Sequence, residues 1–328
     1  MAAAALIVAA TVVSGLSWHE DLEAARAEAA RRGRPILSLR LLGRLDEAMS
    51  CANSRFFRSV LYRDAEVAAL LRDGFVLHWS SERPAPRVTI DFGDGRRLER
   101  TLTGNSVHYV LDAEGRPVDA VPGLYAPRAF ARVLRRGAEV ARDCGGRAGA
   151  GWSACAARHH AAALAAVRGE AGAVPLPPED PAEPRALAAD RRAMAKSLAE
   201  RPLLRALLGE RPERDARPAP APAPVLDGRL RRLLRADGLG AAALARFEAA
   251  LARDTGYNEG VLHARVHDWY ARGAVRGLDA LNHRVYAELF LTPRADPWLG
   301  LADPDVYTAL PLSPPTGAGA APVARSSP

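Results

Sequence analysis

Hydrophobic residues in the first 142 positions fall into two kinds of segment. Four short apolar runs have the length of strands, at residues 36–39, 75–79, 107–111 and 117–121. Four longer segments repeat apolar residues at helical spacing, at residues 21–32, 51–62, 65–72 and 126–142. A Gly-Asp-Gly turn at residues 93–95 predicts a hairpin. This order predicts an α/β domain over residues 17–142, with a mixed central sheet flanked by helices.

Residues with strong capping preferences set the expected helix boundaries. Ser17 and Glu20 have the spacing of a capping box, which predicts a helix that begins directly after them. Gly33 follows the last helical position, so that helix is expected to end there. Asp64 is a favourable N-cap for the helix at residues 65–72.

The second half of the chain has helical periodicity. A Gly-rich linker is predicted at residues 143–151, a helical segment at 152–209 and an extended Pro-rich linker at 210–225. An all-α C-terminal domain is predicted at residues 226–311, with helices at 226–235, 240–253, 257–272 and 278–291. Residues 312–328 are rich in Pro, Gly, Ala and Ser, which is typical of a disordered tail. We therefore expect an α/β domain followed by a separate all-α helical region.

The charge of the chain does not indicate a nucleic-acid partner. The formal net charge is +7, which by itself is compatible with nucleic-acid binding. Lys196 is the one lysine, so 44 of the 45 basic residues are arginine (45 − 1), and they are scattered among acidic residues. The densest group, at residues 229–235, alternates with leucines and forms the solvated face of a predicted helix. We expect no nucleic-acid partner, and no sequence motif calls for a cofactor.

The N-terminal segment at residues 1–16 is apolar and rich in small residues. It suits the core of a signal peptide, although no basic residue precedes it, and it is too short to span a bilayer as a helix. An exported or periplasmic location and a cytoplasmic location both remain open, and no stable membrane span is expected. Cys144 and Cys155 could form a disulfide in an exported protein, which would leave Cys51 as the free thiol.

Cys51 is the first candidate for chemistry. It stands at the predicted start of a helix, where unpaired backbone N–H groups favour the thiolate. Ser54, one turn later, could donate a hydrogen bond to the sulfur, and Arg55 and Arg58 could add positive charge. A thiolate activated in this way would attack disulfides. The alternative is that Cys51, close to two phenylalanines, is a small buried apolar residue.

A series of motifs between Trp18 and Arg142 follows a recognisable order. Trp18, an Ala-rich helix and Arg34-Pro35-Ile36-Leu37 come first, and Cys51, Asp64-Ala65-Glu66-Val67, Phe75-Val76 and Leu111-Asp112-Ala113-Glu114-Gly115 follow. In these motifs the segment resembles the thioredoxin-like superfamily, in particular a bacterial branch of it. The resemblance covers about two fifths of the 328 residues. It implies a thioredoxin fold and aligns Cys51 with the attacking cysteine of a Cys-x-x-Cys motif.

The sequence departs from this family at the positions that dithiol chemistry needs. Ser54 stands where the second cysteine is expected, Ser50 replaces the usual Trp, and Ser106 stands at the position of the cis-proline. Without a second thiol, no neighbouring group can resolve a mixed disulfide. The resemblance then implies a monothiol thiol-disulfide oxidoreductase or isomerase, with Cys51 as nucleophile and Ser54 as its support. The competing interpretation is a redox-inactive module that binds a partner protein through this region and the helical appendage.

The loop that faces the active helix in this family corresponds to Asn105 and Ser106, followed by His108. The resemblance implies that these three residues contact the substrate, a protein thiol or disulfide. His108 could also exchange a proton with Cys51. Because side chains alternate along a strand, His108 could equally point into the sheet.

Two groups of residues have the composition of a metal site. Glu259, His263 and His267 are spaced one helical turn apart and could chelate an ion, although a plain histidine face on a helix is the simpler interpretation. Cys155, His159 and His160, with Cys144 upstream, could bind zinc, although a disulfide or two free thiols would explain the cysteines more simply. No metal is therefore assigned. The aromatic residues Tyr286, Phe290 and Trp298 could anchor a partner, but their incorporation into a core is the preferred interpretation.

Overall fold

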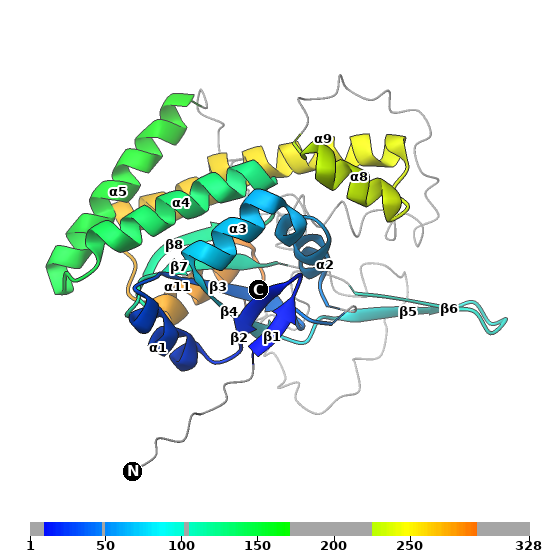
Figure 1. The fold of residues 1–328 in the computed structure, drawn as a ribbon, viewed down its shortest axis with the longest axis horizontal. Helices are drawn as coiled ribbons and strands as arrows, with labels where there is room; N and C mark the ends of the chain where they lie inside the picture. The colour runs from blue at the N-terminus through cyan, green and yellow to red at the C-terminus, as the bar shows by residue number, and fades with distance from the viewer. Residues whose placement is uncertain (1–9, 48–49, 102–104, 171–224, 294–328) are drawn as a thin grey trace, which may run out of the picture.

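The computed structural model describes residues 10–47, 50–101, 105–170 and 225–293 (Figure 1). Its first part contains a six-stranded mixed sheet in the order β1-β2-β4-β3-β7-β8. These strands are β1 (Ala10–Val13), β2 (Leu16–His19), β3 (Ile36–Leu42), β4 (Val76–Arg83), β7 (Val107–Leu111) and β8 (Pro117–Pro122). The strand β4 runs parallel to both β2 and β3, whereas β7 and β8 continue the sheet in antiparallel fashion. The prediction of a mixed sheet flanked by helices is confirmed.

Helices cover both faces of this sheet. Those of the first part are α1 (Leu22–Arg32), α2 (Ala52–Ser59), η1 (Leu61–Arg63), α3 (Ala65–Gly74) and α4 (Pro127–Cys144). Every residue of β3 except Arg40 is buried, as expected for a central strand with both faces covered. Two successive residues of β7, His108 and Tyr109, point to opposite faces, His108 towards η1 and Tyr109 towards the C-terminal helices.

Capping residues correctly predicted the start of α3 and the end of α1, but not the start of α1. The Asp64 side chain accepts hydrogen bonds from the first turn of α3, and Gly33 ends α1 with a left-handed φ of 60°. Ser17, however, lies within strand β2, and the N-cap of α1 is Asp21. The predicted capping box is therefore wrong, because pairing of this segment with β1 and β4 outweighs its local helix-start pattern.

The apolar N-terminal segment contributes a strand to the sheet. Strand β1 pairs antiparallel with β2, and Val13 is buried. The α/β unit thus begins earlier than the predicted boundary at residue 17, because the small and β-branched residues from Ala10 onward extend the sheet edge. Residues 1–9 of the predicted N-terminal segment lie outside the described residues.

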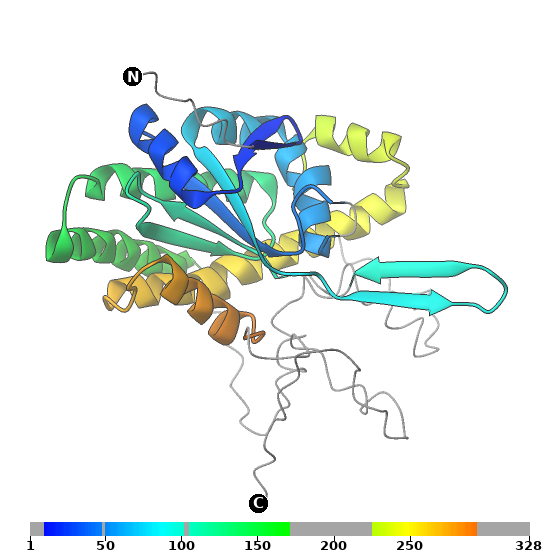
Figure 2. The ribbon, with the colours of Figure 1, turned by 90° about the horizontal axis from the view of Figure 1, so that it is seen from below.

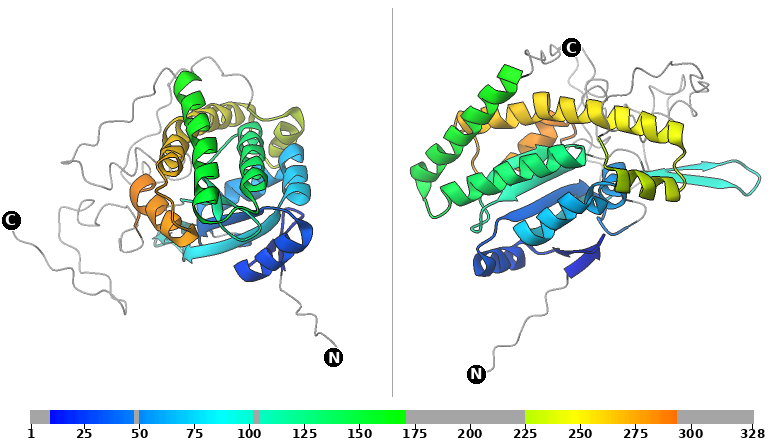
Figure 3. Two further views of the ribbon diagram at one scale, coloured as in Figure 1. Left: turned by 90° about the vertical axis from the view of Figure 1, so that its left-hand side faces the viewer. Right: turned by 45° about the horizontal axis from the view of Figure 1, so that its top comes forward.

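The second half of the chain packs onto the sheet instead of forming a separate domain (Figure 3). Its elements are α5 (Gly149–Glu170), α8 (Gly228–Ala236), α9 (Ala241–Tyr257), η2 (Asn258–His263), α10 (Ala264–Ala271), α11 (Leu278–Arg284) and η3 (Val285–Leu289). Buried residues of both halves form one continuous hydrophobic core. At Gly123, which has a φ of +84°, a Cβ atom would lie 2.6 Å from the side chain of Asn258. The described residues of the second half are helical, as predicted, and their apolar helix faces share a core with the sheet.

Strand β8 is an edge strand whose outer backbone groups are satisfied by these helices. His160 of α5 donates to the carbonyl oxygen of Val118 and Tyr270 of α10 to that of Pro117, each across 2.8 Å. Such side-chain donors replace the neighbouring strand that an edge otherwise lacks. Helices of the second half therefore provide hydrogen-bond donors to the edge of the sheet.

The connection between α4 and α5 is shorter than the predicted linker at residues 143–151. Helix α4 ends at Cys144 and α5 begins at Gly149. A disulfide between Cys144 and Cys155 joins the two helices across this turn. The predicted linker at 210–225 except for Val225, the tail at 312–328 and most of the helical segment at 152–209 lie outside the described residues.

A second, two-stranded sheet projects from the body of the molecule (Figure 2). It consists of β5 (Arg87–Asp91) and β6 (Arg97–Thr101), which form the hairpin that the Gly-Asp-Gly turn predicted. Phe92 at its end is 53% exposed. Within the described ranges, none of the helices has the length and apolar character needed to cross a membrane.

Candidate functional site

Cys51 is the N-cap residue of helix α2, after the loop that follows the central strand β3. Its backbone has φ −59° and ψ 160°, and its Sγ accepts a hydrogen bond from the backbone N–H of Ser54 across 3.4 Å. The backbone N–H of Cys51 donates to the carbonyl oxygen of Leu42, at the end of β3, across 3.4 Å. The sequence therefore placed the thiol correctly, at the start of a helix.

The thiol of Cys51 is nevertheless completely buried, with 0% of the residue exposed. Burial raises the pKa of the thiol to about 11, and the backbone hydrogen bonds and the charge of Arg58 offset only part of this rise. The expectation that the helix start and the nearby arginines would lower this pKa is wrong. The peptide dipoles do act on the sulfur, but the loss of surrounding water has the larger effect.

The hydroxyl group of Ser54 does not support the sulfur in the expected way. It lies 2.7 Å from the Ser50 hydroxyl and 3.4 Å from the carbonyl oxygen of Leu45. The guanidinium group of Arg58 donates to the same Leu45 oxygen across 2.6 Å. Ser54 therefore holds the loop between β3 and α2 in place, and only its backbone N–H contacts Cys51.

Asn105 and Ser106 do lie beside the Cys51 helix, but both are buried. The side chain of Asn53, on α2, donates to the Ser106 hydroxyl across 2.7 Å. Asn105 is held by the C-terminal helices: its side-chain amide donates to Thr292, and its carbonyl oxygen accepts from the Tyr286 hydroxyl, each across 3.1 Å. The groups expected to receive a substrate are thus bonded within the chain itself.

His108 lies in the hydrophobic core, as the alternative interpretation of the strand pattern anticipated. Its Nε2 lies 2.8 Å from the Tyr62 hydroxyl, and its ring contacts those of Phe57 and Phe130 at centroid distances of 4.8 Å. Burial lowers the pKa of His108 to about 3. The imidazole is therefore neutral at physiological pH and is a poor proton donor to Cys51.

Helices from the second half enclose the Cys51 region from two directions. Phe247 of α9 contacts Phe56 of α2 at a ring-centroid distance of 6.2 Å. Tyr286 of η3 is buried, which raises its pKa well above the ordinary value, and it is close enough to Cys51 that an ionised sulfur would raise this pKa further. Phe290 is also buried, in agreement with the prediction of a core role, while Trp298 lies outside the described residues.

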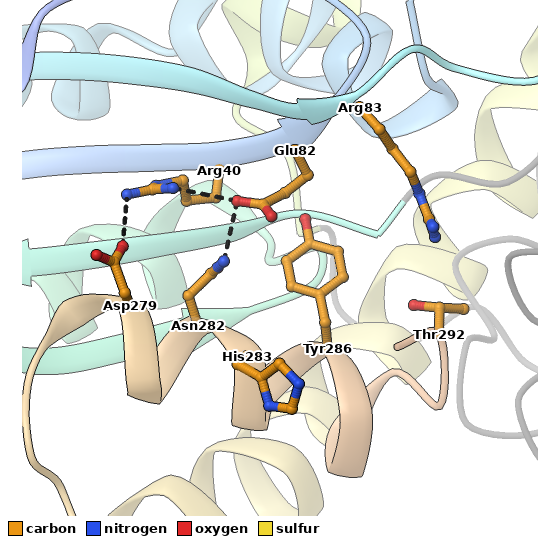
Figure 4. A pocket seen from close by; sticks show the side chains of 8 residues that line it. All are labelled: Arg40, Glu82, Arg83, Asp279, Asn282, His283, Tyr286 and Thr292. Carbon is orange, nitrogen blue, oxygen red and sulfur yellow. Dashed lines mark hydrogen bonds and ion pairs between the residues drawn. The ribbon is translucent and has the colours of Figure 1, made fainter. Parts of the chain in front are cut away.

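A polar pocket of about 120 Å³ lies beside this enclosure (Figure 4). Arg40 and Glu82, near the ends of the parallel strands β3 and β4, face α11 across it. Arg40 pairs with Glu82 at 3.3 Å and with Asp279 at 3.5 Å, and Asn282 donates to Glu82 across 2.9 Å. These residues were not predicted from the sequence, although Arg40 and Glu82 are charged groups within apolar strands. Since Arg40 bridges two carboxylates and Asn282 binds Glu82, these side chains mainly join α11 to the sheet.

The metal groups proposed from sequence are only partly assembled. Glu259 pairs with Arg132 and does not join His263 and His267. The carboxylate beside these histidines belongs to Asp119 of β8, which sequence reasoning missed although it is the one charged residue in its apolar strand.

The second metal group, around Cys155, is not assembled as a zinc site. Cys144 and Cys155 are bonded to each other and therefore offer no thiolate. His159 pairs with Asp143 at 3.4 Å, while His160 turns away from the cysteines towards β8.

The disulfide therefore takes the place of a cysteine–histidine site. Comparison with known proteins found no matching family model, no matching curated protein and no matching solved structure.

Proposed function

We propose that this chain is a thioredoxin-like protein-interaction module that does not catalyse thiol–disulfide exchange. The observation that carries the proposal is the complete burial of the Cys51 thiol, in a region where the C-terminal helices bind the neighbouring loop. The thioredoxin-like part of the proposal rests on the mixed sheet and on Cys51, which caps the helix that follows a central strand. Both features agree with what the sequence resemblance implies.

Catalysis by Cys51 would need a thiolate and access for a disulfide. With a pKa of about 11, about one thiol in ten thousand is ionised at pH 7. Asn105, which would contact a substrate, is bonded to Tyr286 and Thr292. A disulfide could reach the buried sulfur only after the structure around Cys51 had opened.

The β5–β6 hairpin is the surface best suited to a partner protein. Neither strand pairs with the main sheet, and a two-stranded hairpin alone is only marginally stable in water. The Arg96 guanidinium lies 5.1 Å from the centre of the exposed Phe92 ring. Aromatic and arginine side chains are enriched in protein interfaces, and the edge of a two-stranded sheet can pair with another chain.

One observation favours the monothiol oxidoreductase as a second candidate function. Cys51 is the N-cap of α2 and accepts a backbone N–H bond, which is the geometry that activates thiolates when water has access. In that case the C-terminal helices would act as a cover that opens. The two candidates differ in whether Cys51 turns over a substrate.

The test is a turnover assay with the full chain and a peptide–glutathione mixed disulfide, in the presence of glutathione. We expect the wild type and Cys51→Ser to give the same background rate. A wild-type rate at least tenfold above that of Cys51→Ser would overturn the proposal and support the monothiol enzyme.

A photo-crosslinking residue at Phe92 tests the interaction surface, with the exposed Val12 as the control position. A defined crosslinked protein at Phe92 alone is expected, and equal labelling at both positions would contradict a role for the hairpin.

A further inference from the structure

Four side chains that can bind metals meet in the core between the sheet and the second half of the chain. They are Asp119 from β8, His160 from α5, His263 from η2 and His267 from α10, and each is only 2–3% exposed. One ligand atom of Asp119, one of His263 and one of His267 all lie within 4.8 Å of one another. Residues separated by more than a hundred positions in the chain thus form one compact cluster.

The orientation of His160 is fixed from outside the cluster. Its Nε2 donates to the carbonyl oxygen of Val118, so in the neutral ring the Nδ1 atom carries a lone pair. That Nδ1 lies 2.7 Å from Nδ1 of His267. His267 therefore donates its Nδ1–H to His160, which leaves the Nε2 atom of His267 with the lone pair that can bind a metal. A ligand histidine in a metal site commonly donates its second ring N–H to an acceptor outside the site, as His267 does.

The cluster contains a buried carboxylate without a permanently charged partner. Asp119 is only 2% exposed, and the imidazole of His263 lies against its carboxylate. In the part of the chain that the structure describes, no arginine or lysine pairs with Asp119, whose ion-pair partner is His263 at 2.8 Å. A buried anion of this kind favours a bound cation.

The surroundings of the cluster also suit a cation. His263 and His267 are both buried, and a neutral imidazole is the form that binds a metal. The hydroxyl of Tyr125 is buried without a hydrogen-bond partner among the described residues, and Tyr125 is near enough to feel the charge of Asp119. His263 ends the π-helical segment η2, and such segments occur frequently at functional positions.

We propose that Asp119, His263 and His267 bind one divalent transition-metal ion, for which Zn²⁺ is the best match, and that His160 orients His267. Imidazole nitrogens and a carboxylate oxygen are ligands that Zn²⁺ accepts. The contact of 2.7 Å between the Nδ1 atoms of His160 and His267 then fixes the ring of a ligand histidine from outside the site. The ion would join β8 to η2 and α10.

The experiment uses the untagged full chain, stripped with a chelator and dialysed against Zn²⁺, Co²⁺ or Ca²⁺. We expect about one Zn²⁺ per chain by elemental analysis, a rise in Tm of about 5 °C or more and no effect of Ca²⁺. Co²⁺ should give the visible absorption of a nitrogen- and oxygen-bound ion. Wild-type protein that binds neither Zn²⁺ nor Co²⁺ and shows no change in Tm would overturn the proposal.

Substitutions of the proposed ligands test where in the chain the ion binds. Asp119→Asn and His263→Gln should weaken Zn²⁺ binding at least about tenfold. Two matched controls, Glu259→Gln and His159→Gln, change groups of the same chemistry that lie outside the cluster and should bind Zn²⁺ as the wild type does. Binding that is lost in His159→Gln but kept in Asp119→Asn would overturn the proposal. Because Asp119 and His263 bond to each other, the wild-type titration remains decisive if these variants fail to fold.

Discussion

The hydroxyl group of Tyr286 donates a hydrogen bond to the backbone oxygen of Asn105 across 3.1 Å, although the two residues are 181 positions apart. This bond ties the C-terminal helices to the loop beside Cys51. The Asn105 side chain also donates a hydrogen bond to Thr292, so two bonds hold this loop against the C-terminal part of the chain. The region around the thiol is thus stabilised by specific polar contacts as well as by apolar burial.

Tyr286→Phe should loosen this region while leaving the ring packing intact. Loss of the hydroxyl leaves a buried carbonyl without its donor, which costs about 1–2 kcal/mol. Local opening should then become more frequent, and alkylation of Cys51 about fivefold to tenfold faster. Tyr270→Phe is the matched control, because Tyr270 also donates to a buried carbonyl oxygen, that of Pro117. The control should lose similar stability without faster alkylation. Equal acceleration in both variants would argue against a specific role for Tyr286.

Reduction of the disulfide between Cys144 and Cys155 should lower the free energy of unfolding. The two cysteines are 11 positions apart, and closing a loop of this size stabilises a fold by about 2–3 kcal/mol. Denaturant unfolding with and without reductant measures the effect, and Cys144→Ala/Cys155→Ala should unfold at the same midpoint under both conditions. A wild-type midpoint that does not respond to reductant would contradict the prediction.

Asp254 should make stability depend on pH in the neutral range. It is buried, its Oδ2 has no hydrogen-bond partner among the described residues, and burial raises its pKa to about 7. A raised folded-state pKa contributes stability below pH 4, and this contribution is lost as the pH rises through about 7. Asp254→Asn should therefore gain about 2–4 kcal/mol relative to the wild type between pH 4 and pH 8.

The difference between these two proteins isolates Asp254 from other titrating groups. Burial lowers the pKa values of His78 and His108, so both proteins lose stability as the pH falls below about 6.5. That loss cancels in the comparison. Denaturant unfolding of both proteins at several pH values gives their free energies of unfolding. A difference between these free energies that stays constant with pH would contradict the prediction, because the ionisation of Asp254 would then not affect stability.

Substitution by serine should affect stability strongly at one phenylalanine and hardly at all at another. Phe57 is completely buried and contacts Tyr62 and His108, so Phe57→Ser should cost at least about 3 kcal/mol. Phe92 lies on the projecting hairpin, so Phe92→Ser should change stability by no more than about 0.5 kcal/mol. Thermal unfolding compares the two. A large loss in Phe92→Ser would mean that the hairpin packs on the body instead of being free for a partner.

Local patterns in the sequence predicted most of the elements. Strand β7 was expected at residues 107–111 and is found at Val107–Leu111, and Asp64 caps α3 as its side-chain chemistry indicated. These elements depend on periodicity, turn residues and caps, which operate over a few positions. Ser17 shows the limit of such signals, because the same residues fit a helix start and a strand, and pairing with distant strands decided the outcome.

The environment of Cys51 could not be predicted in the same way. Its position at the start of a helix is local, but its neighbours Asn105 and Phe56 contact Tyr286 and Phe247, which lie far away in the sequence. The same holds for Asp119, whose partner His263 is 144 positions away. Helical periodicity shows that a residue faces a core, but not which part of the chain completes that core.

The reactivity of Cys51 in the native full chain tests the central claim most directly. A thiol-specific alkylating reagent is added at pH 8 under non-reducing conditions, which keep Cys144 and Cys155 bonded, and modification is followed by mass spectrometry with and without denaturant. With a pKa of about 11, about one thiol in a thousand is ionised, and burial slows the reaction further. We predict labelling at least about a hundredfold slower in the native protein than in the denatured protein. Native labelling as fast as that of the denatured chain would show an accessible, activated thiol and would contradict the account.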